Sequence, residues 1–192
     1  MSETAEESLR RAVDALPLRL RRHIYRTLDE GLRLAARHAV DAAKVRLAVL
    51  GHDLCRVTPP PDLVSLATAL GLAPNEAERA SPILLHGPLA ACLLQQRFGI
   101  GDTEVLDAVR YHMTGRAGMS GLEKVLFLAD KTEPRKLAHY PERRPAHRLA
   151  RTDLDAAMAA LLALYVEQAQ REGWPLHSNV LAAHACYVTA AS

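Results

Sequence analysis

Apolar residues recur at three- and four-residue intervals along most of the chain, which is the spacing of one face of an α-helix. Residues 9–38 show this pattern most plainly, and the single break at Pro17 predicts two consecutive helices. The same pattern predicts further helices over about residues 42–56, 63–70, 86–98, 102–112 and 119–132, a short one from Pro74, a long one from Thr152 to Gly173 and a last one from Ser178.

Polar residues and prolines mark the ends of these helices. Asp41 is placed to cap the helix over 42–56, and Thr152 with Asp155 matches a capping box for the long C-terminal helix. Ser178 is expected to cap the last helix. By contrast, residues 136–148 combine prolines and histidines with several basic residues, a composition that predicts an exposed loop.

Composition narrows the fold class. Hydrophobic residues make up 49% of the 192 positions while aromatic residues make up only 4%, so the apolar set consists mainly of Leu, Ala and Val. These residue types suit helix-on-helix packing. A chain of this length can bury one good core, so we expect an all-α fold in a single compact domain over residues 1–192.

Charge and cysteine usage exclude several classes of protein. The net charge of +2 argues against a nucleic-acid polymer as partner, and Cys55, Cys92 and Cys186 lack the spacing of a disulfide framework or a thiolate zinc site. No apolar run approaches the length of a membrane span, and residues 1–8 lack the apolar segment of a signal peptide. We therefore expect a cytoplasmic protein with no membrane contact.

Six residues form a candidate metal site, because each lies on an apolar helix face or at a helix end. They are His23, His52, Asp53, His86, His112 and Asp130. Taken alone, a histidine on an apolar face is more often a hydrogen-bonded core residue, and we assign that role to His38, His139, His147, His177 and His184. The adjacent His52 and Asp53 favour the metal site, because an unpaired buried carboxylate would cost several kcal/mol and needs a cation nearby.

The donor types indicate which metals fit. Imidazole and carboxylate ligands without sulfur favour iron, manganese or zinc over magnesium or copper(I). Six protein ligands exceed what one catalytic ion with an open position needs, so we interpret the set as a dinuclear site. In this interpretation Asp53 bridges both ions and His52 binds one of them. Cys55 points about 100° per residue away from both on a helix, so we expect it to pack in the core.

These residues lie in blocks that resemble the HD superfamily of metal-dependent phosphohydrolases, and more closely its YqeK branch. The matching blocks are residues 51–53, 85–91, 108–112, 114–116, 122–125, 128–130 and 133–134. His23 fits the family's first ligand by its distance ahead of His52. The resemblance implies an HD-domain helical bundle with a metal-binding core over about residues 20–136 and further helices over about 150–190.

The resemblance also implies an activity and the residues that carry it. A member of this branch would use a divalent metal centre, most readily dinuclear iron, to hydrolyse diadenosine tetraphosphate symmetrically to two ADP. Asp53 and Arg56 are the implied catalytic residues, Arg56 standing where the family has a lysine. The candidate substrate contacts are Thr114, Gly115, Arg116, Lys131 and either or both of Arg135 and Lys136, for which a solvated helix face is the alternative interpretation.

Two other functions fit the same residues. One is an HD phosphohydrolase that acts on another nucleotide, such as a nucleoside diphosphate, a deoxynucleotide or a cyclic nucleotide. The other is a non-catalytic regulator that binds a nucleotide or a protein partner and uses metal only for structure. The expected partner is a small-molecule nucleotide, and we expect a monomer or a homodimer.

Overall fold

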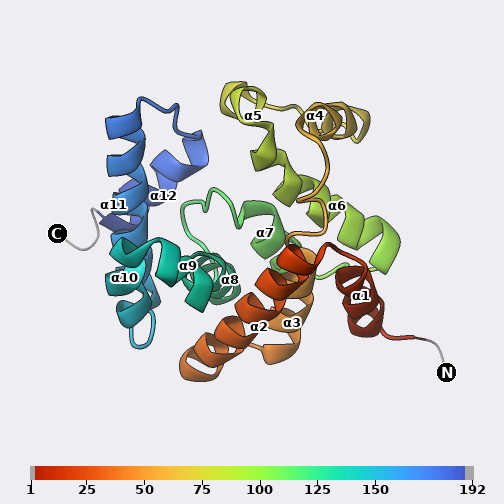
Figure 1. The fold of residues 1–192 in the computed structure, drawn as a ribbon, viewed down its shortest axis with the longest axis horizontal. Helices are drawn as coiled ribbons and strands as arrows, with labels where there is room; N and C mark the ends of the chain where they lie inside the picture. The colour runs from red at the N-terminus through yellow and green to blue at the C-terminus, as the bar shows by residue number, and fades with distance from the viewer. Residues whose placement is uncertain (1–2, 189–192) are drawn as a thin grey trace.

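The computed structural model describes residues 3–188, which form helices and turns with no strand among them (Figure 1). The chain begins with α1 (Ala5–Asp14) and continues after Pro17 with α2 (Leu18–His38), so the predicted break at this proline is confirmed. The remaining helices are α3 (Ala42–Gly51), α4 (Pro60–Ala69), α5 (Glu76–Ala80), η1 (Pro82–Leu85), α6 (His86–Phe98), α7 (Thr103–Tyr111), α8 (Gly121–Thr132), α9 (Pro134–His139), η2 (Pro141–Arg143), α10 (Arg144–Leu149), α11 (Leu154–Glu172) and α12 (Ser178–Val188). The predicted all-α fold class is confirmed.

Helix α8 is the buried centre of the bundle. It packs against α2, α3, α7 and α11, and it lies near the middle of the molecule in Figure 1. A helix that is apolar on all sides is buried on all sides. Its apolar residues are all buried, namely Leu122, Val125, Leu126, Phe127, Leu128 and Ala129. A charged residue in the last turn of such a helix is therefore held inside the protein.

The helices that carry the candidate ligands are neighbours in space. Helix α2 packs along α3 and α8, while α6 packs along α7, which in turn contacts α3 and α8. The predicted cap at Asp41 is confirmed for α3, Gly99 follows α6 with a positive φ of 65°, and Asp102 caps α7. The expected helices therefore bring their polar ends to one place.

Helix α3 is shorter than predicted. It ends at Gly51 rather than near Arg56, and residues 52–58 form successive turns. The amides of Leu54 and Arg56 bond to carbonyls three residues back, on Gly51 and Asp53, in place of the four-residue spacing of an α-helix. His52 and Asp53 therefore lie at a helix end and not within a regular helix.

The prediction of a loop over residues 136–148 is wrong, although most of the segment is exposed as expected. This segment is built from α9, η2 and α10, and Ala146 is fully buried. The prolines that suggested a loop lie instead in the first turn of each short helix, where the missing amide hydrogen costs nothing. The segment packs beside α8 and α11.

Two predicted caps are also wrong by one position. Asp153, not Thr152, caps α11 and accepts a hydrogen bond from the amide of Ala156. Ser178 is the first residue of α12, and the imidazole Nδ1 of His177 accepts from the amide of Asn179 instead. In both cases the neighbouring side chain reaches the free amides of the first turn.

None of the helices over residues 3–188 combines the length and the hydropathy that crossing a bilayer requires.

Candidate metal centre

All six predicted ligand residues come together in one buried cluster. His23 projects from α2, His52 and Asp53 follow α3, His86 begins α6, His112 follows α7, and Asp130 lies in the last turn of α8. His52 and His86 are fully buried, His112 is 1% exposed, and the two aspartates are each 5% exposed. Five separate segments of the chain therefore supply one cluster of donors.

The carboxylate of Asp53 lies between two pairs of imidazoles. Its Oδ1 is 3.0 Å from Nε2 of His86 and 3.7 Å from Nε2 of His112. Its Oδ2 is 3.6 Å from Nε2 of His52 and 3.7 Å from Nε2 of His23. Each oxygen of this one side chain thus faces a different pair of histidines, which is the placement that a bridging ligand requires.

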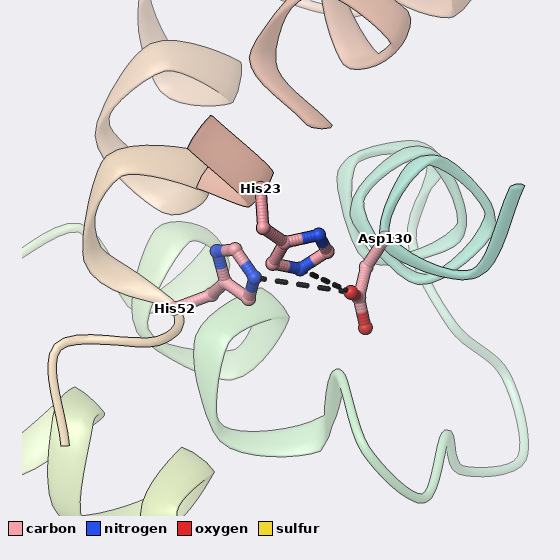
Figure 2. A group of neighbouring side chains, drawn as sticks. All are labelled: His23, His52 and Asp130. Atoms are coloured by element: carbon pink, nitrogen blue, oxygen red, sulfur yellow. Dashed lines mark ion pairs between the residues drawn. The ribbon is translucent and has the colours of Figure 1, made fainter. Parts of the chain in front are cut away.

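Asp130 closes the side of the cluster that holds His23 and His52. Figure 2 shows both imidazoles directed at the same carboxylate oxygen of Asp130, at 3.0 Å from Nε2 of His23 and 4.0 Å from Nε2 of His52. Its other oxygen pairs with the ammonium group of Lys131. Asp130 is therefore held between an imidazole and a buried lysine.

Three of the four imidazoles are oriented by the main chain. The Nδ1–H groups of His52 and His112 donate to the carbonyls of Val49 and Val109, both at 2.7 Å, and that of His86 donates to the carbonyl of Ile83. Each acceptor lies three residues before its histidine. A hydrogen bond at Nδ1 fixes the tautomer and leaves the Nε2 lone pair for a ligand in the centre.

His23 is instead oriented by a side chain. Its Nδ1 lies 3.3 Å from Oε1 of Glu133, whose carboxylate also accepts from Nε of Arg26 at 2.6 Å and from the amide of Arg135 at 2.8 Å. Glu133 is only 1% exposed. It therefore joins a candidate ligand on α2 to the start of α9, and we describe it as a positioning residue.

The electrostatics of the cluster keep its carboxylates ionised. Burial by itself would raise the pKa of Asp53 and of Asp130, but the facing groups outweigh burial: His52 and His86 lower the pKa of Asp53, and Lys131 with His23 lowers that of Asp130. Burial opposes protonation of His23, yet hydrogen bonds to Asp130 and Glu133 raise its pKa to about 9.

Two of the histidines are held neutral by their surroundings. Burial lowers the pKa of His52, and burial together with the neighbouring His86 and His52 lowers that of His112 well below its usual value. A neutral imidazole is the form that binds a metal ion. The buried cluster therefore combines neutral nitrogen donors with ionised oxygen donors.

The donor set fits divalent metal ions. The Nε2 atom of His52 is buried and has no hydrogen-bond partner within residues 3–188, which is costly unless another group binds there. Ligand atoms of His23, His52 and Asp130 lie within 4.8 Å of one another, and so do those of His52, Asp53 and His112. These are two overlapping groups, and two buried carboxylates call for positive charge between them.

A cavity of about 600 Å³ opens beside the cluster and is strongly basic. His23, Asp53 and Asp130 form its inner end. Four cations line it without a hydrogen bond or ion pair from their side chains to any group within residues 3–188, namely Arg19, Arg56, Arg135 and Lys136. The Nη1 atom of Arg56 is buried and unpartnered. Positive groups that lack carboxylate partners favour an anionic ligand.

Comparison with known proteins agrees with this arrangement. A family model described as the HD domain matches residues 20–135, which is more than half of the chain and contains all six candidate ligands. This chain belongs to the HD domain family. The predicted family is thereby confirmed, and the cluster described above lies entirely within its HD domain.

Relatives of known name extend the match beyond the HD domain. The chain is 34% identical over 136 residues to a protein of Bacillus subtilis named symmetrical bis(5'-nucleosyl)-tetraphosphatase, covering 71% of this chain and 72% of that protein. It is 30% identical over 162 residues to a protein of the same name from Halalkalibacterium halodurans, covering 84% and 85%.

A solved structure shares the whole architecture. It is the crystal structure of a protein described as a predicted HD superfamily hydrolase involved in NAD metabolism from Clostridium acetobutylicum. The TM-score is 0.87 at 28% sequence identity, and the match covers 96% of this chain and 97% of that one. The likeness therefore includes the C-terminal helices that follow the HD domain.

The predicted substrate contacts divide into two groups. Lys131, Arg135 and Lys136 line the basic cavity, as does Arg56, which was predicted as a catalytic residue. Arg116 does not, because its guanidinium pairs with Glu123 at 2.6 Å and with Asp107 at 3.5 Å. Thr114 donates to the carbonyl of Gly115 and lines a separate cavity of about 190 Å³, while Gly115 packs beside Phe127 in the core.

Several residues that line the basic cavity were missed in the sequence. Arg19 and Arg26 lie four residues before and three residues after His23, so helical spacing placed them on the ligand's own face. The helical spacing in the sequence was therefore enough to place both arginines beside His23. Glu133 lies in the matching block over residues 133–134 but was given no role, and Tyr140, Arg143 and Tyr165 lie in or beyond the segment that was expected to be a loop.

Proposed function

We propose that this chain is a metal-dependent hydrolase that splits diadenosine tetraphosphate into two ADP. One observation carries the proposal: a buried cluster of histidines and aspartates opens into a cavity lined by Arg19, Arg56, Arg135 and Lys136, whose side chains have no ion pair within residues 3–188. A polyphosphate is the kind of ligand that would bind both to metal ions in the cluster and to the cations of the cavity. The symmetrical cleavage is supported by the names of relatives that are 30% and 34% identical.

We further propose that the cluster holds two iron ions, with manganese and zinc as alternatives. His23, His52, Asp53 and Asp130 would hold one ion, and His86, His112 and the second oxygen of Asp53 would hold the other. Bound divalent ions lower the pKa of water and neutralise phosphate oxygens, which is the chemistry that anhydride hydrolysis needs.

The side chains around the cluster bind and orient the substrate in this proposal. Water adds to a phosphorus next to the central bridging oxygen, the bond from that phosphorus to the bridging oxygen breaks, and the second ADP leaves with the oxygen. Arg56, Arg135 and Lys136 bind the phosphate oxygens and stabilise the charge that grows on the leaving diphosphate. Lys131 holds Asp130 and donates to the carbonyl of His112 at 3.0 Å, so it orients the ligands.

The activity is tested by product analysis. Purified protein loaded with Fe²⁺ without oxygen is incubated with diadenosine tetraphosphate, and the products are separated by ion-exchange chromatography. We expect ADP alone. AMP with ATP would contradict symmetrical cleavage, and turnover of a deoxynucleotide, a nucleoside diphosphate or a cyclic nucleotide in place of the dinucleotide would identify a different HD phosphohydrolase. If the metal-loaded protein hydrolyses none of these nucleotides, the result would favour the alternative of a non-catalytic regulator.

A pair of arginine variants separates phosphate binding from structural support. Replacing Arg56 with methionine removes an unpaired charge from the cavity, so we expect KM to rise about tenfold or more, as loss of a charge-assisted hydrogen bond does. Replacing Arg116 with methionine instead leaves the buried Glu123 without its partner, so we expect unfolding to become easier by about 1–3 kcal/mol with KM little changed.

Steady-state kinetics and thermal melts on both variants measure the two effects. If Arg116→Met raised KM as much as Arg56→Met, while its melting temperature stayed the same, the assignment of the phosphate contacts to the basic cavity would be wrong.

A further inference from the structure

The basic cavity has an aromatic wall. Tyr140 and Tyr165 both line it, and the guanidinium of Arg143 lies over both rings, 4.1 Å from the centroid of Tyr140 and 5.4 Å from that of Tyr165. Tyr140 is 42% exposed although it contacts this cation. Tyr140 therefore has exposed surface at the cavity that a ligand can contact in addition to Arg143.

The wall is fixed to the same helix as the candidate ligand Asp130. Nη1 of Arg143 donates to the main-chain carbonyl of Lys131 at 3.3 Å, and Lys131 directly follows Asp130 on α8. Arg143 therefore spans the space between the end of α8 and the ring of Tyr140. The side chain of Arg143 therefore links the ring of Tyr140 to the helix that carries Asp130.

The main chain around Tyr140 does not depend on its ring. Its amide donates to the carbonyl of Lys136 at 2.7 Å, and its carbonyl accepts from the amide of Arg143 at 3.1 Å. These bonds close the turn between α9 and η2 whatever side chain is present. The tyrosine ring is thus not needed to hold the turn, and its exposed placement over the cavity calls for another reason.

We propose, building on the function proposed above, that Tyr140 backed by Arg143 is the platform on which a purine base of the nucleotide substrate stacks. Base rings stack on tyrosine and on arginine planes, and a cation on one side of an aromatic ring adds to the attraction. The cavity then binds the phosphates through Arg56, Arg135 and Lys136 and the base through Tyr140, all of which line it. This division of contacts selects nucleoside polyphosphates over inorganic polyphosphate.

The test compares a ligand that has a base with one that has none. Dissociation constants for ADP and for pyrophosphate are measured by calorimetry on the Mn²⁺-loaded protein and on the variants Tyr140→Ala and Tyr140→Phe. We expect Tyr140→Ala to weaken ADP binding about tenfold, within the range found when stacking aromatic residues are removed, and to leave pyrophosphate binding unchanged. Tyr140→Phe keeps the ring and should bind both ligands as the parent does.

Trp174 supplies the matched control, because it is an exposed aromatic residue, 57% exposed, that does not line the cavity. Trp174→Ala is expected to bind ADP and pyrophosphate like the parent. Equal weakening of both ligands in Tyr140→Ala, or no weakening of ADP, would overturn the proposal. Melting temperatures and metal content of each variant are measured alongside, so that a folding defect is recognised as such.

A fluorescence reporter gives a second measurement that does not use turnover. Trp174 is the only tryptophan of the sequence, so the double variant Trp174→Phe with Tyr140→Trp carries one tryptophan at the platform. We expect ADP to quench its emission and pyrophosphate to leave it unchanged; quenching by both ligands or by neither would count against stacking.

The platform and the proposed reaction can fail separately. If diadenosine tetraphosphate is not hydrolysed but the selective quenching by ADP is seen, the proposed reaction is wrong and the platform stands. If diadenosine tetraphosphate is hydrolysed to ADP with the same KM in Tyr140→Ala as in the parent, the reaction stands and the platform is wrong.

Discussion

Replacing Asp53 with alanine is expected to abolish turnover and to remove at least one metal ion from each chain. Its two carboxylate oxygens face different pairs of imidazoles, at 3.0 and 3.7 Å on one side and 3.6 and 3.7 Å on the other. Loss of a metal ion removes several kcal/mol of transition-state stabilisation, so we expect the rate to fall by roughly a thousandfold or more. Metal analysis by mass spectrometry and an assay of ADP release measure the two effects.

Asp29 provides the control for this variant. It is an exposed aspartate on α2, the helix that carries His23. Asp29→Ala should keep the metal content and the rate of the parent protein. Full activity in Asp53→Ala, or unchanged metal content, would rule out the bridging role of this carboxylate.

The second large effect is expected from Gly87→Ala, which adds one methyl group next to the cluster. A Cβ atom at Gly87 would lie 2.8 Å from the carbonyl oxygen of Arg110, 3.1 Å from that of Val109 and 3.2 Å from Nδ1 of His112. Two of these are main-chain atoms, so α6 and α7 must move apart. Since Val109 also orients His112, the Nε2 atoms of His86 and His112, now 2.9 Å apart, would separate.

We expect this variant to lose about a hundredfold in kcat/KM, the scale at which a misplaced ligand or its support acts, and to bind its second metal ion more weakly. The overpacking should also cost about 1–3 kcal/mol of stability. Gly101→Ala is the matched control, because a Cβ there meets no atom within 4 Å. Parent-like activity and metal affinity in Gly87→Ala would show that the close approach of α6 and α7 is not required.

The helices and the buried cluster of histidines and aspartates could be predicted from the sequence for the same physical reason. Apolar spacing determines which face of a helix is buried, and a charged or imidazole side chain on that face must find a partner inside. Asp130 in the last turn of the apolar α8 is the clearest example, because its burial follows directly from its neighbours. The six residues were therefore identified without any knowledge of how the helices pack.

The substrate cavity was predicted less well, because it depends on packing between distant segments. Arg116 matches the family block, but its guanidinium is occupied by Glu123, seven residues later, and no local pattern distinguishes a paired arginine from a free one. Arg143 had no assigned role because prolines 141 and 145 were interpreted as loop signals, whereas each lies in the first turn of a short helix. The local composition of this segment does not reveal which cavity its side chains line.

The order of segments along the chain has a further consequence for how this protein can be re-engineered. The last candidate donor, Asp130, lies shortly before α9 and η2, whose residues border the cavity, and none of the other five candidate donors lies in α9, η2 or the following α10. Residues 134–149 therefore form a single contiguous cassette. We expect the exchange of that cassette for the equivalent stretch of another HD protein to change the nucleotide preference, while the six candidate metal ligands keep their own neighbours in the sequence.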